Sequence, residues 1–320
     1  MEKMLNVSSN PHIRSSAKTW KIMLTVFVAL LPAAGFGVYL FGPYALLLLI
    51  ISTLTAVITE VIGCIILKKK ISISDCSALV TGLLLGLNLP PGAPWWMAVI
   101  GSVFAIFVVK LLFGGLGQNI MNPALAGRCF LVISFAKYMT DFSVHTGWGY
   151  LPDGMTGATP LSMLKNGQGA DVHRMVLGLH GGCIGETSVI AICIGAIIML
   201  MFGVIELHIP AAYIISFAIF YIIFGGHGAD PYYLTGQLAG GGLMLGAFFM
   251  ATDYVTSPVT KPGRIVYGIL LGILTGVFRV FGSTAEGVSY AIIISNLMVP
   301  LIDKGIHEFQ KKYPDIVFWF

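Results

Sequence analysis

Apolar residues run through most of this chain in stretches that approach the length of a membrane span, separated by short polar or glycine-rich segments. A helix of about 20 apolar residues crosses the roughly 30 Å hydrocarbon core of a bilayer. The third and eighth stretches are too short or too rich in glycine for plain spans, so we expect broken helices there. The pattern predicts ten spans, at about 22–40, 44–67, 78–89, 95–112, 121–139, 187–205, 209–224, 237–252, 265–281 and 288–302.

The composition also predicts an all-α integral membrane protein. Of 320 residues, 57% are hydrophobic and 10% are charged, and the mean hydropathy is +0.89. A water-soluble fold could not cover that much apolar surface, so a soluble enzyme is excluded. A transmembrane β-barrel needs alternating polarity, which the chain lacks. No basic face supports nucleic-acid binding, and the five cysteines, without a CxxC pair, predict neither disulfides nor a metal site.

Lysine and arginine residues predict the orientation, because they are enriched in cytoplasmic segments. With the N-terminus inside, twelve of them fall on the cytoplasmic side and only Lys165 and Arg174 lie in the outer segments. The predicted parts are a cytoplasmic tail at 1–21, a five-helix half at 22–139, an extracytoplasmic loop at 140–186, a second five-helix half at 187–302 and a cytoplasmic tail at 303–320.

Five spans in each half make the second half enter the membrane from the opposite side, so we expect two inverted repeats. The Thr-Gly pair at 81–82 with Gly86 is echoed by the Thr-Gly pair at 235–236 with Gly240. Inverted-repeat proteins break helices at such places around a site near the membrane midplane. A channel or small-solute transporter without a redox role is built in the same way, so the architecture leaves the function open.

The outer loop contains the sequence DGMTGATP at 153–160, which has no apolar periodicity. A turn in a solvated linker explains its spacing. No GxSxG motif surrounds Thr159, so a hydrolase nucleophile is not indicated. A threonine hydroxyl flanked by glycine-rich chain can instead be presented to a modifying enzyme. Asp153, six residues earlier, could help that enzyme hold a metal-bound substrate.

Ionisable side chains in membrane spans are energetically expensive and are therefore candidates for function. We take Glu60, Arg128 and Asp253 as candidate ion-coupling residues. Glu60 and Arg128 are the better candidates for burial, although a structural ion pair explains them as well as an ion path does. Asp253 and Lys110 also fit an interfacial position.

Three histidines, His145, His173 and His180, lie in the outer loop. Their spacing matches no zinc site. We therefore expect these histidines to be exposed.

Segments along nearly the whole chain resemble the D subunit of the Rnf ion-translocating electron-transport complex. They are SNPHIRSS near the start, ALLPA at 29–33, FGGLGQNIMNPALAGR at 113–128, GETS at 185–188, FFMATDYVTSPVT at 248–260, FRVFGSTAEGVSYAII at 278–293 and NLMVPLID at 296–303. DGMTGATP is similar to the Asp-x-x-Ser/Thr-Gly-Ala-Thr acceptor motif, on which a flavin transferase attaches FMN through a phosphoester to the final threonine.

The resemblance implies that Thr159 carries covalent FMN. It also implies that Asp153, Thr156, Gly157 and Ala158 are the elements that the transferase recognises. The chain would then carry electrons between ferredoxin and NAD in a bacterial or archaeal plasma membrane and couple them to Na+ or H+ movement. The implied partners are the transferase and other Rnf subunits, including a second flavinylated subunit and iron-sulfur subunits.

A related family remains an alternative. The B subunit of the Na+-translocating NADH:quinone reductase shares the fold and the flavinylated threonine. It usually has a longer N-terminal extension, whereas the first span here begins near residue 22. That relative also holds riboflavin noncovalently, which extends the expectation to a second flavin near the helix breaks.

Overall fold

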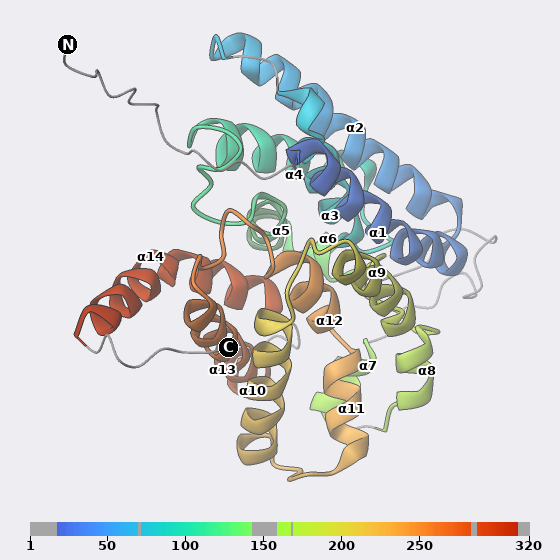
Figure 1. Cartoon of the computed structure of the whole chain (residues 1–320). Helices are drawn as coiled ribbons and strands as arrows, with labels where there is room; N and C mark the ends of the chain where they lie inside the picture. The colour runs from blue at the N-terminus through green and yellow to red at the C-terminus, as the bar shows by residue number, and fades with distance from the viewer. Residues whose placement is uncertain (1–17, 70–71, 143–158, 168, 283–286, 313–320) are drawn as a thin grey trace.

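The computed structural model describes the chain except for residues 1–17, 70–71, 143–158, 168, 283–286 and 313–320 (Figure 1). The regular secondary structure of the described part is helical, and no strand occurs within it. Four helices are long and apolar enough to cross a membrane: α1 (Thr19–Phe41), α2 (Pro43–Ile66), α13 (Lys261–Phe281) and α14 (Val288–Lys312). The prediction of an all-α membrane protein is confirmed, while the count of ten spans stays a prediction.

Shorter helices make up the rest of the described fold. Three of the apolar ones are α3 (Ser77–Leu87), α5 (Pro123–Ser134) and α9 (Val189–Met201), and a fourth is α10 (His208–Phe224). Another apolar helix begins as α4 (Trp95–Val103) and continues as the π-helix η2 (Phe104–Leu111). The remaining elements are the 3-10 turn η1 (Ile73–Asp75), α6 (Ala136–Met139), α7 (Pro160–Lys165), α8 (Val172–Leu177), α11 (Pro231–Ala239), α12 (Leu243–Leu245) and the π-helix η3 (Gly246–Met250).

The predicted span at 237–252 is a broken helix in the structure. α11 begins at Pro231, earlier than predicted, and ends at Ala239. The chain then passes through Gly241 and Gly242 at φ values of 64° and 66° before α12 begins. These left-handed conformations favour glycine because it has no Cβ. The glycines that suggested a break therefore lie at the break itself.

The last predicted span is longer than its apolar stretch. The pattern predicts an end near residue 302, but α14 continues to Lys312. Its final turns are polar, and Lys304 and Glu308 are 4.0 Å apart across one turn, a spacing that supports an exposed helix. Part of the predicted C-terminal tail is therefore helical.

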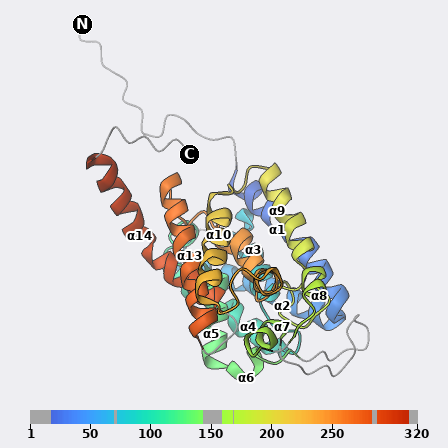
Figure 2. The ribbon, with the colours of Figure 1, turned by 90° about the horizontal axis from the view of Figure 1, so that it is seen from below.

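Corresponding helices of the two halves make similar contacts. α1 packs against α9 and α5 packs against α14, which joins the first and the last helices of the halves. Within the halves, α2 packs against α4 as α10 packs against α13. A repeat requires this correspondence, although the inverted orientation stays a prediction. Figure 2 shows α6, α7 and α8 towards one end of the molecule, and the beginning of α1 and the end of α14 towards the other.

A row of glycines on α13 sets the distance to α10. Gly268, Gly272 and Gly276 follow one another at every fourth position. A Cβ atom would lie 2.6 Å from the Ala212 Cβ at position 268 and 2.6 Å from the Phe217 nitrogen at position 272. Small residues with this spacing allow helix backbones to approach closely in a membrane. The spacing of these three glycines is visible in the sequence alone.

We expect Gly272→Ala to destabilise the protein, because the added methyl group meets backbone that cannot move freely. Overpacking of this kind costs about 1–3 kcal/mol. The matched control is Gly35→Ala in α1, where a Cβ meets nothing within 4 Å. Thermal unfolding of the detergent-solubilised protein measures the difference. Equal unfolding temperatures for the two variants would contradict the packing argument.

Candidate functional site

A buried ion pair joins α2 to η2. The Lys110 ammonium lies 2.6 Å from Oε1 of Glu60, and the side chains are 1% and 0% exposed. Lys110 also donates to Ser77 Oγ at 2.6 Å, and Ser72 donates to Glu60 Oε1 at 2.7 Å. The other carboxylate oxygen of Glu60 is buried and has no hydrogen-bond partner among the described residues. Lys110 is thus buried and paired inside the protein rather than exposed at its surface, and its depth in the membrane stays a prediction.

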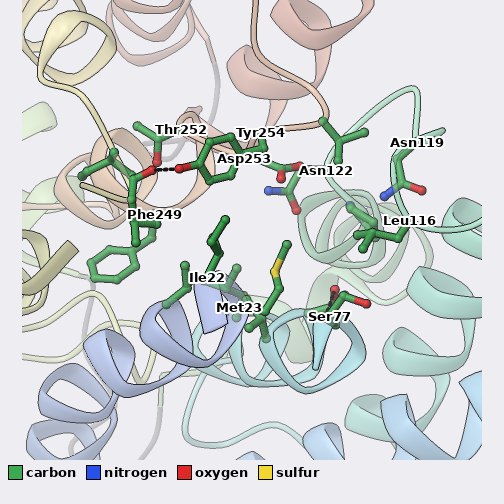
Figure 3. A pocket seen from close by; sticks show the side chains of 18 of the residues that line it. Ile22, Met23, Ser77, Leu116, Asn119, Asn122, Phe249, Thr252, Asp253 and Tyr254 are labelled. Atoms are coloured by element: carbon green, nitrogen blue, oxygen red, sulfur yellow. Dashed lines mark hydrogen bonds between the residues drawn. The ribbon is translucent and has the colours of Figure 1, made fainter. Parts of the chain in front are cut away.

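Lys110 and Ser77 also line a cavity of about 70 Å³ between the two halves (Figure 3). Ile22 and Met23 of α1 lie on the same side of this cavity as Ser77, and Asp253 lies across from them. Asp253 accepts a hydrogen bond from Thr256 Oγ1 at 3.1 Å. Two of the three candidate ion-coupling residues are therefore associated with one cavity. Asp253 lines it, and Glu60 is paired with Lys110, which also lines it.

Arg128 belongs to a second polar cluster. Its Nη1 lies 3.1 Å from Glu186 Oε1 and donates to Asn88 Oδ1 at 3.1 Å and to Ser289 Oγ at 2.9 Å. Its Nη2 lies 3.5 Å from Cys183 Sγ. All of these groups are buried. Arg128 thereby joins both halves to the end of the outer loop, and the ion pair allowed by the sequence is present.

The backbone next to Glu186 is fixed at the end of α3. The Ile184 amide donates to the Leu89 carbonyl at 3.0 Å, and the Gly185 amide donates to the Leu87 carbonyl at 2.8 Å. A Cβ on Gly185 would lie 2.6 Å from the Leu87 side chain, so this approach requires glycine. The carboxylate of Glu186 is therefore held by backbone as well as by Arg128.

Thr159 is the only residue of the predicted acceptor motif, apart from Pro160, that falls within the described part of the chain. It precedes α7, and its hydroxyl accepts a hydrogen bond from the Ser162 amide at 3.4 Å. Asp153, Thr156, Gly157 and Ala158 lie outside the described residues, as does His145.

Thr159 borders a small hollow of about 10 Å³. The other residues around this hollow come from the start of α7, the segment before α9 and the break between α11 and α12: Pro160, Leu161, His180, Gly181, Gly182, Glu186 and Gly241. Leu161 and Leu164 of α7 are buried, and Leu164 packs with Met175 and Ala239. The described part of the outer loop is therefore packed onto the second half, unlike a solvated linker.

His180 differs from the expectation of exposed loop histidines. Its Nδ1 is buried and has no hydrogen-bond partner among the described residues. Burial lowers the pKa of His180 to about 4, so the imidazole is neutral near pH 7. His173, in α8, is exposed as expected.

Arg279 is a residue of the site that sequence reasoning missed. This buried side chain of α13 donates to the carbonyl oxygens of Gln237, Gly240 and Gly241, which follow from the end of α11 into the break. A charge within a predicted apolar span was the available signal. Glu186 was also missed as a site residue, because the sequence shows it only within the GETS segment. Its pairing with Arg128 depends on the fold.

The two polar sites lie near opposite ends of α3. Ser77 begins this helix at the cavity, and Asn88 follows its end at the Arg128 cluster. With a rise of 1.5 Å per residue, the helix separates them by about 16 Å. The structure therefore groups the candidates into an ion-pair site at the cavity and a second site, where Arg128 pairs with Glu186 beside the Thr159 hollow.

Broken helices, buried charges and several apolar helices define a multi-pass membrane protein with polar sites in its interior. The sequence pattern of the NQR2, RnfD, RnfE family matches residues 6–312. The chain belongs to this family.

Individual relatives cover almost the whole chain. The D subunit of the Na+-translocating ferredoxin:NAD+ oxidoreductase complex from Acetobacterium woodii is 46% identical over 312 residues, which are 96% of this chain and 95% of that protein. The D subunit of the proton-translocating ferredoxin:NAD+ oxidoreductase complex from Clostridium ljungdahlii is 42% identical over 318 residues, 95% of each chain. The D subunit of an ion-translocating oxidoreductase complex from Stutzerimonas stutzeri is 38% identical over 328 residues, 91% of each chain.

We expect Arg128→Gln to destabilise the protein strongly, because it leaves the Glu186 carboxylate buried without its counter-charge. Breaking a buried pair in this way costs about 3–5 kcal/mol. Thermal unfolding in detergent checks the loss, and the double variant Arg128→Met with Glu186→Leu should recover part of it.

The matched control is Arg174→Gln. Arg174 pairs with Asp171 at 3.4 Å, but both side chains are largely exposed. Such a pair contributes less than about 1 kcal/mol. A loss of stability as large in Arg174→Gln as in Arg128→Gln would show that burial does not decide the effect.

Proposed function

We propose that this chain is the D subunit of an Rnf complex, in which it carries electrons between ferredoxin and NAD through FMN esterified to Thr159. The electron transfer is coupled to movement of Na+ or H+. The relatives named as D subunits support this assignment over the B subunit of an NADH:quinone reductase and over a transporter without redox function. The observation that carries the flavin assignment is the position of Thr159 beside the hollow.

The hollow fits one part of FMN. A space of about 10 Å³ accepts about one water-sized group, so a phosphoryl oxygen on Thr159 fits there and the three-ring flavin does not. The ring would therefore lie outside the hollow. When bound, FMN supplies the electron-transfer chemistry, while the protein supplies position, hydrogen bonds and exclusion of water.

The chain's own residues hold the acceptor in place. Leu161 and Leu164 anchor α7 in the packed interior. The Lys165 ammonium donates to the Gly282 carbonyl at 2.5 Å, which ties the end of α7 to the end of α13. The Ala170 amide donates to the Tyr232 hydroxyl at 2.9 Å, which ties the segment after α7 to α11. Thr159 is thereby presented from a fixed support.

The ion path is assigned to the cavity at the other end of α3. Glu60 has one carboxylate oxygen without a hydrogen-bond partner among the described residues, and Lys110 neutralises the other. A cation or proton that reaches Glu60 must displace or compete with the Lys110 ammonium. The pair would therefore control entry from the cavity, which Asp253 also lines.

The orientation predicted from the basic residues places this cavity towards the cytoplasm and Thr159 towards the outer side. Ferredoxin and NAD are both cytoplasmic. Electrons would therefore cross to the outer side and return through cofactors of other subunits, including a second flavinylated subunit and iron-sulfur subunits. This route offers a way to couple redox state to ion movement.

The described cavity is smaller than a typical small-molecule site, so it does not support a riboflavin site. Small-molecule sites usually have about 300–1,000 Å³. The cavity of about 70 Å³ is much smaller, so we assign no step to a second flavin.

We expect Thr159→Ala to abolish covalent flavinylation. Wild type produced together with a flavin transferase should give a band that fluoresces under ultraviolet light after denaturing electrophoresis, and Thr159→Ala should give none, because the acceptor oxygen is absent.

The control is Thr140→Ala, which removes an exposed hydroxyl at the other end of the same loop. It should leave the fluorescence unchanged. An unlabelled wild-type band, obtained with a transferase that labels another acceptor, would refute the flavin assignment and favour the transporter alternative.

We expect Glu60→Gln to uncouple the complex, because the amide removes the negative charge beside Lys110 while keeping nearly the same shape. Ferredoxin:NAD oxidoreduction should continue, and Na+ or H+ uptake into vesicles per electron should fall severalfold.

Glu206→Gln is the matched control, since Glu206 pairs with Arg264 at 2.6 Å in an exposed turn. It should leave the ratio of ions to electrons unchanged. Normal pumping by the Glu60→Gln complex would end the proposal for this residue.

A further inference from the structure

The Thr159 hollow contains more recognition chemistry than an attachment point requires. Esterification of Thr159 places a negatively charged phosphoryl group at the edge of this hollow. The groups that face the hollow are then its first possible partners: His180, the glycines at 181 and 182, Glu186 and Gly241. Their hydrogen-bonding state indicates which of them can receive an anion.

His180 is half-buried, and its Nδ1 is a buried atom without a hydrogen-bond partner in the described structure. Its Nδ1 is shielded from solvent and makes no hydrogen bond to another described residue. An unsatisfied buried polar atom costs about 1–3 kcal/mol. A partner supplied after folding, by modification of the neighbouring threonine, would remove this cost.

The two following glycines leave room and free donors. A Cβ on Gly181 would meet nothing within 4 Å, and one on Gly182 would meet only the Thr187 side chain at 3.9 Å. Neither amide makes a hydrogen bond to another described residue. The segment His180-Gly181-Gly182 therefore borders the hollow with one side-chain nitrogen and two backbone amides that have no hydrogen-bond partner among the described residues.

The local charge also permits an anion. Glu186 brings a carboxylate to the hollow, but Arg128 lies 3.1 Å from it and offsets its charge. His180 is neutral in the unmodified protein, since burial lowers its pKa to about 4. A nearby phosphoryl anion favours the charged imidazolium, so flavinylation should raise the pKa of His180.

We propose that His180 binds the phosphoryl group on Thr159 through Nδ1 and thereby fixes the covalent flavin against the protein. This assignment rests on the proposed function, because it requires FMN on Thr159. His180 is a positioning residue: it holds a phosphoryl oxygen, with the proton on Nδ1, and takes no part in electron transfer. The hollow accepts this oxygen and excludes the ring.

Fluorescence anisotropy of the covalent flavin in the native, detergent-solubilised protein tests the assignment. His180→Ala should lower the anisotropy at equal covalent flavin content, because the flavin then rotates on a single threonine side chain. Loss of a hydrogen bond to a charged group should lower the ratio of immobilised to freely rotating covalent flavin about tenfold or more.

His180→Asn provides the rescue, since its amide nitrogen occupies nearly the position of Nδ1 and can donate. Its anisotropy should stay close to wild type, as should that of His173→Ala, which removes an exposed histidine from the same loop. A purely structural role for the imidazole would lower the anisotropy in the asparagine variant as much as in the alanine variant.

Three results would overturn the assignment: wild-type anisotropy in His180→Ala, no rescue by asparagine, or loss of covalent flavin from both His180 variants, which would make His180 a recognition residue for the transferase. A denaturing gel, run first, separates these results from failure of the proposed function. Wild type without covalent flavin would refute the proposed function and this assignment together.

Discussion

Polar backbone groups inside the hydrocarbon region need partners within the protein, and the broken helices of this fold depend on how that requirement is met. At the break between α11 and α12, Arg279 of α13 donates to three carbonyl oxygens along residues 237–241. A guanidinium suits this place because it presents five N–H donors in a planar fork. The break therefore persists because another helix supplies a buried cation. Gly241 lies in this break and lines the Thr159 hollow, so the shape of the hollow also depends on Arg279.

Arg128 serves a related purpose at the end of α3, but it connects more of the molecule. Through Asn88, Ser289 and Glu186 it joins the first half, the second half and the outer loop. A buried ion pair of this kind is costly to desolvate, and removal of one partner leaves the other charge buried without compensation. Glu186, which borders the Thr159 hollow, is consequently held by an arginine of the first half.

The separation between the two polar sites constrains any coupling mechanism. Asp253 lines the cavity, where Lys110 pairs with Glu60, whereas Thr159 and Glu186 line the hollow. Groups about 16 Å apart along a helix do not interact directly through hydrogen bonds. Under the proposed function, redox state and ion movement would therefore communicate through α3 and α5, which reach both sites.

The sequence by itself determined the fold class, most of the apolar helices and the glycine break, because hydropathy and glycine act over short stretches. The acceptor role of DGMTGATP is also read from a local motif and stays a prediction. It did not determine which charges meet. Lys110 could be placed at the interface until η2 brought it to Glu60, and Arg128 had no identified partner until Glu186 was fixed at the end of α3. His180 was expected to be exposed, and only packing against the second half buries its Nδ1. These features depend on contacts between residues far apart in the chain, which only the tertiary structure decides.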